Sequence, residues 1–240
     1  MNKQTQVQRL CRQRAIMILS SVLLLIGSLY AAEMLAPEPV SVAYRYQRPL
    51  LVIDPGHGGI DGGAIAYDGT KESDLNLQIS LKLQSLSDFY GVKTLLTRDE
   101  NNPAQDPQTY SERHDLEQRA EIANQSGSCI LFSIHQNTFP TSQPMGVQVL
   151  YGQGEESRRL GELTHNRLIK ALQPDNRRVA APAAKTLFLP SHVDCPFILI
   201  ECGFLSNYSD LQRLCDSRYQ NSFAAVLLSS FLQFTRTPTL

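Results

Sequence analysis

Residues 51–59 read L-V-I-D-P-G-H-G-G, a short apolar run that stops at a proline and a glycine. Apolar runs of this length, ended by turn-forming residues, are typical of strands buried on both faces, so 50–54 is predicted to be such a strand. Strands of this kind belong to parallel sheets whose two faces are covered by helices. The segment therefore favours an α/β fold, with His57 placed among three glycines just beyond the first strand.

From this segment to residue 236, strand and helix patterns alternate along the chain. Further strands are predicted at 92–97, 129–134, 146–151, 186–189 and 197–201, and helices at 73–90, 112–125, 155–172 and 210–234. About 190 residues are enough for one domain with a full core. We expect a single α/β domain at 49–236, with a mostly parallel twisted sheet flanked by helices on both faces.

The N-terminus has the pattern of a membrane segment. Residues 15–32 carry no charge, and residues 1–14 contain four basic residues and no acid. A run of about 18 uncharged residues can cross a bilayer as a helix, and the basic residues predict that 1–14 is cytoplasmic. A cleaved signal segment is the alternative, although Leu29 or Tyr30 would then occupy a position that prefers small residues. Residues 33–48, with two prolines, are predicted to be a tether to a domain outside the cytoplasm.

Charge and cysteine content exclude several classes of site. The net charge is −1 and the domain has no basic run, which argues against a nucleic-acid partner. The five cysteines form no C-x-x-C pair, which argues against a cysteine zinc site, and the domain is too large to need a disulfide framework. Cys129 is expected to pack within its strand. Cys202 is expected in the core, because it points away from the face that carries Glu201.

Chemically active side chains recur at the carboxyl ends of predicted strands. His57 follows the first strand, and His135 and Glu201 end two others, while Glu72 directly precedes a predicted helix. In parallel α/β sheets, ligands bind beyond the carboxyl ends of the strands. Two histidines and one carboxylate form the donor set of a hydrolytic zinc site that keeps one position open. We therefore predict that His57, Glu72 and His135 bind Zn²⁺.

Glu201 has a separate predicted role. It ends the strongly apolar strand F-I-L-I-E (197–201). A carboxylate that points inward from such a strand needs either a hydrogen-bond or ion-pair partner or a catalytic function. We predict that Glu201 is the general base, which takes a proton from the attacking water and returns it to the leaving amine. Asp54 and Asn137 are candidates for orienting the metal ligands.

Each of these residues also has an ordinary structural interpretation. A histidine between glycines after a strand often only marks a turn, and Glu72 near a helix start favours the helix dipole. The combination in its local contexts favours the metal site over these separate explanations. Of the other histidines, His165 is expected at the surface or in packing, and His192 is a candidate for contact with substrate.

In combination, five segments resemble the zinc-dependent N-acetylmuramoyl-L-alanine amidases of the amidase-3 family. They are D-P-G-H-G-G-I-D-G-G (54–63), Glu72, L-E-Q-R-A-E-I-A-N (116–124), S-I-H-Q-N (133–137) and I-E-C-G-F-L-S-N (200–207). The resemblance implies hydrolysis of the amide between the lactyl group of N-acetylmuramic acid and L-alanine of peptidoglycan stem peptides. It also implies that His57, Glu72 and His135 bind Zn²⁺ and that Glu201 is catalytic.

Three features look like the germination-specific, spore-cortex amidases of endospore formers. They are a single anchor directly before the domain, the segment Y-S-E-R-H-D-L-E-Q-R (110–119), and the short distance from the second histidine to the glutamate. This resemblance implies cortex glycan with peptide stems as partner, a part in muramic-δ-lactam formation, and a location in the cell wall or spore intermembrane space. The protein would be secreted if the N-terminal segment were cleaved.

Two alternatives stay open at this point. One is a vegetative cell-wall autolysin with the same chemistry. Another is a non-catalytic peptidoglycan-binding regulator, although such proteins usually lose a ligand or the glutamate, and all four residues are present here. The sequence also leaves open whether an activating protein partner is needed.

Overall fold

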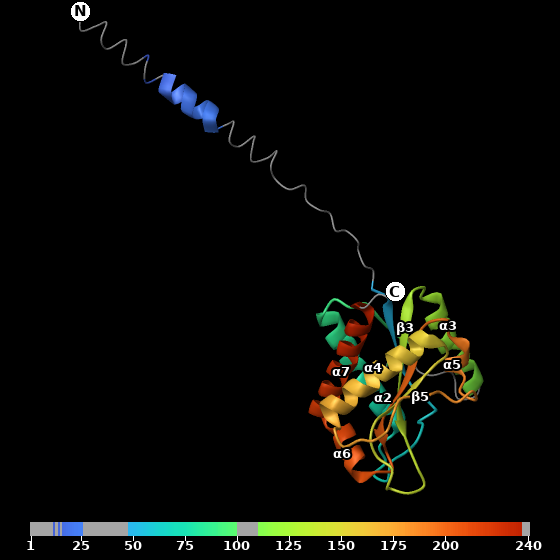
Figure 1. Cartoon of the computed structure of the whole chain (residues 1–240). Coiled ribbons are helices and arrows are strands. Elements are labelled where there is room, and N and C mark those ends of the chain that lie inside the picture. Colours follow the sequence, from blue (N-terminus) through green and yellow to red (C-terminus); the bar gives the residue numbers. More distant parts are fainter. Residues whose placement is uncertain (1–11, 13, 15, 26–47, 100–109, 237–240) are drawn as a thin grey trace, which may run out of the picture. The chain divides into compact units, whose positions relative to one another are not determined.

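The computed structural model describes residues 12, 14, 16–25, 48–99 and 110–236 (Figure 1). The chain divides into two compact units, Met1–Gln47 and Arg48–Leu240, and residues 16–25 of the first are helical. Within the described part of the chain, no helix is both long and apolar enough for a membrane span. The predictions for 1–14, 15–32 and 33–48 lie largely outside the described residues and stay predictions.

A six-stranded sheet in the order β2-β1-β3-β6-β4-β5 forms the centre of the second unit. Its strands are β1 (Leu50–Pro55), β2 (Thr94–Leu96), β3 (Cys129–Asn137), β4 (Gln148–Tyr151), β5 (Ala181–Pro182) and β6 (Phe197–Phe204). Neighbouring strands are parallel except for β4 and β6, which run antiparallel. This confirms the prediction of a mostly parallel sheet.

Helices cover both faces of this sheet, as predicted (Figure 1). They are α2 (Glu72–Phe89), α3 (Glu112–Gln125), α4 (Gly154–Leu172), α5 (Leu189–His192), α6 (Tyr208–Cys215) and α7 (Ser217–Arg236). Successive side chains of a strand point to opposite faces. Leu51 and Ile53 therefore join the large core formed with α2, α4 and α7, whereas Val52 joins a smaller core with α3 and α5.

One strand prediction is wrong. Residues 186–189 do not form a strand; they lead into the short helix α5, and the strand of this region is β5 at Ala181–Pro182. Pro190 lies in the first turn of α5, where its missing N–H costs nothing and its fixed φ favours a helix start. Leu189 is buried, as its place in an apolar run leads one to expect, but a helix rather than a strand carries it.

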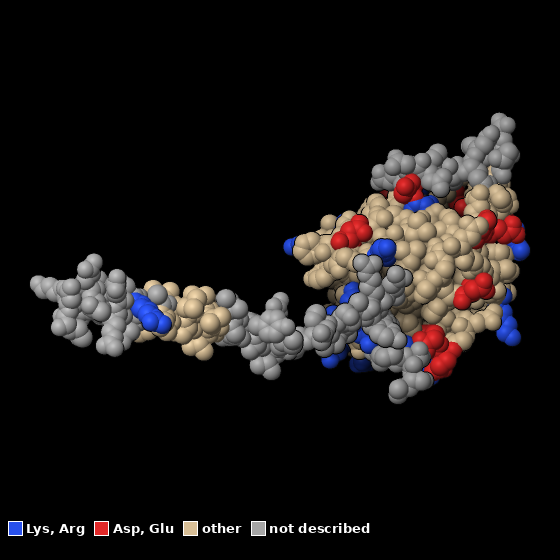
Figure 2. Space-filling view, turned by 90° about the horizontal axis from the view of Figure 1, so that it is seen from above, with Lys and Arg blue, Asp and Glu red and all other residues tan. Residues whose placement is uncertain are grey.

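The two cysteine predictions hold. Cys129 is buried in the smaller core, and Cys202 is fully buried in the large core on the opposite face from Glu201. On the surface seen in Figure 2, acidic and basic side chains are scattered among uncharged ones, in keeping with a net charge near zero.

Candidate metal centre

Three polar side chains from separate elements converge at the carboxyl end of the sheet. His57 lies two residues beyond β1, Glu72 is the first residue of α2, and His135 lies near the end of β3. Their ligand atoms all lie within 4.8 Å of one another. Glu72 Oε1 is 3.3 Å from His57 Nε2 and 3.1 Å from His135 Nδ1. Ligand atoms of a tetrahedral zinc ion are spaced by about 3.3 Å, so the donor set and its spacing fit zinc.

Glu72 is held in place by the backbone on both sides of the centre. The N–H of Ala64 donates to its Oε2 and the N–H of Gln136 donates to its Oε1, each at 3.0 Å. Burial disfavours the charged form, but hydrogen bonds with His135 and His57 outweigh it and hold the pKa of Glu72 well below its usual range. The carboxylate is therefore charged and fixed, as a cation ligand requires.

Asp61 orients His57, a role that was not predicted from the sequence. His57 Nδ1 lies 2.7 Å from Asp61 Oδ2, which leaves Nε2 turned toward Glu72. Burial lowers the pKa of His57, but its hydrogen bonds and charge interactions with Glu72 and Asp61 raise it to about 9. This pKa favours the protonated imidazole at neutral pH in the metal-free chain, and a cation held by Nε2 would have to displace a proton. The spacing of His57 and Asp61 within the 54–63 motif was the available signal.

Two arginines, Arg98 and Arg119, grip the backbone around His57; we call them the arginine clamp. Arg119 donates to the carbonyl oxygens of Pro55 at 2.8 Å and His57 at 2.7 Å. Arg98 donates to those of Pro55 at 2.8 Å and Gly56 at 3.1 Å. His57 has a φ of 60°, a left-handed conformation that costs a non-glycine residue about 1 kcal/mol or more. The clamp offsets this strain and fixes the imidazole.

Asp54 acts through the arginine clamp rather than on a metal ligand. It is fully buried, pairs with Arg119 at 2.7 Å, and accepts hydrogen bonds from Ser133 and Thr97, each at 2.6 Å. The side chain of Asn137 accepts from the N–H of Thr138 instead. Among the described residues, Asp61 rather than Asp54 or Asn137 makes the hydrogen bond to a ligand side chain, and Asp54 acts on His57 only through Arg119.

The charge of Asp54 predicts a loss of stability in acid. Burial raises its pKa, but Arg119, Ser133 and Thr97 together lower it from 3.8 to about 2. A lowered folded-state pKa stabilises the protein above pH 3.8, and this contribution of about 2 kcal/mol is lost as the pH falls toward 2. Urea unfolding between pH 5 and pH 2 should show this loss in the wild type and a flatter dependence in Asp54→Asn. If the free energy of unfolding depended equally on pH in the two proteins, the lowered pKa would not belong to Asp54.

Gly56 gives the His135 ring its space. A Cβ on Gly56 would lie 2.2 Å from Cε1 and Nε2 of His135, closer than any real contact. We expect Gly56→Ala to displace the ring and lower activity at least about tenfold, because a small shift of a metal ligand is costly. Gly62→Ala is the matched control, since its Cβ would meet only Lys71 at 3.5 Å. Activity and bound zinc are measured for both, and equal values would refute the steric argument.

Glu201 stands beside this cluster on the neighbouring strand. In the parallel pairing of β3 and β6 it is the partner of His135, so both side chains leave the sheet on the same face. Its Oε2 is buried and has no hydrogen-bond partner among the described residues. Burial raises the pKa of Glu201 to about 7, with His135 lowering and Glu72 raising it. An unpartnered carboxyl with this pKa can exchange a proton near neutral pH.

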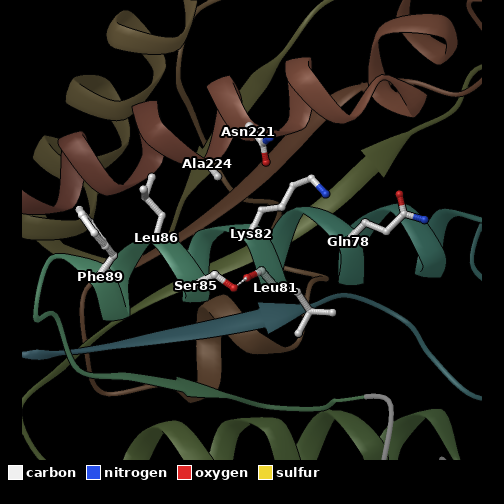
Figure 3. A pocket seen from close by; sticks show the side chains of 8 residues that line it. All are labelled: Gln78, Leu81, Lys82, Ser85, Leu86, Phe89, Asn221 and Ala224. Carbon is white, nitrogen blue, oxygen red and sulfur yellow. Dashed lines mark hydrogen bonds between the residues drawn. The ribbon is translucent and has the colours of Figure 1, made fainter.

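The remaining predicted candidates lie elsewhere. His165 is buried in packing, with Nε2 2.9 Å from the carbonyl oxygen of Arg178. His192, the last residue of α5, stacks on Phe188, which precedes the helix, at 3.7 Å between ring centroids. An open groove of about 470 Å³ lies between α2 and α7, and none of its lining residues belongs to the cluster (Figure 3).

Comparison with known proteins gives consistent matches. A family model described as N-acetylmuramoyl-L-alanine amidase matches residues 51–230. The germination-specific N-acetylmuramoyl-L-alanine amidase of Bacillus subtilis (strain 168) is 31% identical over 192 residues, which are 77% of this chain and 79% of that protein.

Solved structures match over the same region. The CwlD amidase from Clostridioides difficile, in complex with the GerS lipoprotein, is similar with a TM-score of 0.72 and 32% identity, covering 78% of this chain and 98% of that one. N-acetylmuramoyl-L-alanine amidase AmiC2 of Nostoc punctiforme is similar with a TM-score of 0.69 and 27% identity, covering 79% and 98%.

Proposed function

The chain belongs to the N-acetylmuramoyl-L-alanine amidase family, and on that premise we propose that it is a zinc hydrolase of peptidoglycan. The bond cleaved would be the amide between the lactyl group of N-acetylmuramic acid and L-alanine of the stem peptide. The observation that carries the proposal is the convergence of His57, Glu72 and His135 at one edge of the sheet, with Glu201 beside them.

In this proposal each side chain has one task. His57 Nε2, Glu72 and His135 Nδ1 would hold Zn²⁺, and Asp61 would keep the proton of His57 on Nδ1. Zinc, when bound, polarises a carbonyl and makes water a better nucleophile at neutral pH. Glu201 would accept a proton from the attacking water and pass it to the departing amine of L-alanine.

We extend the proposal to the spore cortex. It is supported by the 31% identity to a protein named as a germination-specific amidase and by the similarity to the CwlD amidase. Residues 15–32 would anchor the domain outside the cytoplasm. An activating protein partner is part of this proposal, because the CwlD amidase was solved with the GerS lipoprotein.

Two experiments separate the general from the narrow function. The purified chain should release stem peptides from peptidoglycan, and a chelator should abolish the release until zinc is restored. Cortex muropeptides of a strain lacking the gene should then contain no muramic-δ-lactam. An unchanged muropeptide profile would reject the cortex role, and a vegetative autolysin would then be the better explanation.

A further inference from the structure

Two cysteines lie at corresponding positions of neighbouring parts of the chain, one at the start of β3 and one just before β6. Cys129 is the first residue of β3, and Cys195 lies two residues before β6. Leu131 is the register partner of Phe197 in this parallel pair, so the cysteines are each two residues upstream of a matched position. Cys129 belongs to the smaller core under α3 and α5, where its Sγ donates to the carbonyl oxygen of Ala123 at 3.4 Å, and Cys195 packs against the same core.

The geometry of this pair suits a covalent bond. The N–H of Leu131 donates to the carbonyl oxygen of Pro196 at 2.9 Å, so the pairing of the two segments reaches the residue next to Cys195. Paired strands lie about 4.8 Å apart, and disulfides join residues whose Cα atoms are about 4.4–6.8 Å apart. The segment that carries Cys195 is also fixed from outside. The side chain of Asn124 on α3 donates to the carbonyl oxygen of His192 at 2.9 Å and accepts from the N–H of Asp194 at 2.9 Å.

We propose that Cys129 and Cys195 form a disulfide bond when the domain lies in an oxidising compartment. Both are free thiols in the structure. The other described cysteines have different surroundings: Cys202 is fully buried on the opposite face of the sheet, and Cys215 is exposed at the end of α6. The physiological setting rests on the proposed location outside the cytoplasm, where disulfides persist, but the bond itself can be tested in solution.

The reaction is thiol–disulfide exchange with a disulfide donor such as oxidised glutathione. One of the two sulfurs loses its proton and attacks the donor disulfide, and one donor thiol leaves. The other cysteine sulfur then attacks the mixed disulfide, the Cys129–Cys195 bond forms, and the second donor thiol leaves. The protein loses two protons and two electrons, and the donor disulfide gains them as two thiols.

The bond would join the two strands that carry His135 and Glu201 at their other ends. It closes a loop of more than sixty residues that includes α4 and α5, and closing a loop of this length restricts the unfolded chain strongly. We therefore expect the main effect on stability, with little change in turnover, because neither cysteine touches the metal centre.

Peptide mapping by mass spectrometry tests the proposal on the full-length chain carrying Cys11→Ser and Cys215→Ser, equilibrated with reduced or oxidised glutathione. The expected result is one new peptide pair linked through Cys129 and Cys195 in the oxidised sample. The melting temperature should rise by roughly 5–15 °C on oxidation and fall back on reduction.

Cys195→Ala in the same background is the control, and its melting temperature should not respond to oxidation. Two free thiols at Cys129 and Cys195 after equilibration with excess oxidised glutathione would overturn the proposal. Amidase activity, measured in parallel, separates this result from the proposed function: an active enzyme without the linked peptide rejects the disulfide alone.

Discussion

Glu201→Gln is expected to lower kcat by about 10³-fold while the protein keeps its fold and its bound zinc. The amide has nearly the shape of the carboxylate but cannot accept a proton, and general acid–base catalysis typically contributes about 10²–10⁴-fold. The variant should keep its fold, because a neutral amide of nearly the same shape replaces a buried carboxyl group whose charged form burial disfavours. Release of stem peptides, zinc content and melting temperature are measured together.

The control for this substitution is Glu121→Gln, at an exposed glutamate of α3 that accepts a hydrogen bond from Gln125 in its own helix. It should leave kcat unchanged. If Glu201→Gln retained more than about half of the wild-type rate, Glu201 would not be the base.

His57→Ala is expected to remove metal and activity together. In this variant, Glu72 and His135 are the only proposed metal ligands that remain, and the carboxylate of Glu72 faces one imidazole instead of two. Because even partners of metal ligands contribute about 10–100-fold to affinity, loss of a ligand itself should weaken zinc binding by at least about 10³-fold. Zinc content by elemental analysis should fall well below one equivalent, and stem-peptide release should become undetectable.

A graded series sharpens this test. Asp61→Asn keeps the ligand but weakens its orientation, so zinc affinity should fall only about 10–100-fold. His114→Ala, at an exposed position of α3, should change neither quantity. Full zinc content in His57→Ala would contradict the proposed ligand set.

The sequence predicted the centre because the key residues are attached to strong local patterns. His57, His135 and Glu201 each follow or end an apolar strand, and parallel strands bring their carboxyl ends to one edge. The α/β fold class was predicted from the alternation of strand and helix patterns along the chain. The antiparallel orientation of β4 was not predicted, because four residues carry no signal of direction.

The supporting residues could not be predicted for a different reason. Arg119 lies in an amphipathic helix where a charged residue is expected to face solvent, yet it is 5% exposed and paired with Asp54. Its partner lies 65 residues earlier in the chain, and only the packing of α3 on the sheet brings the two together. The strand predicted at 186–189 was wrong because an apolar run indicates burial but does not indicate whether a strand or a short helix is buried.

The arginine clamp has a consequence for the order of assembly during synthesis. Arg119 follows the carbonyl group it holds on His57 by 62 positions, and the other imidazole, on His135, is translated later still. Until α3 has emerged from the ribosome and docked, the left-handed backbone at His57 lacks the guanidinium that stabilises it. A chain released before that point would carry the first histidine motif without the hydrogen bond from Arg119 and without His135.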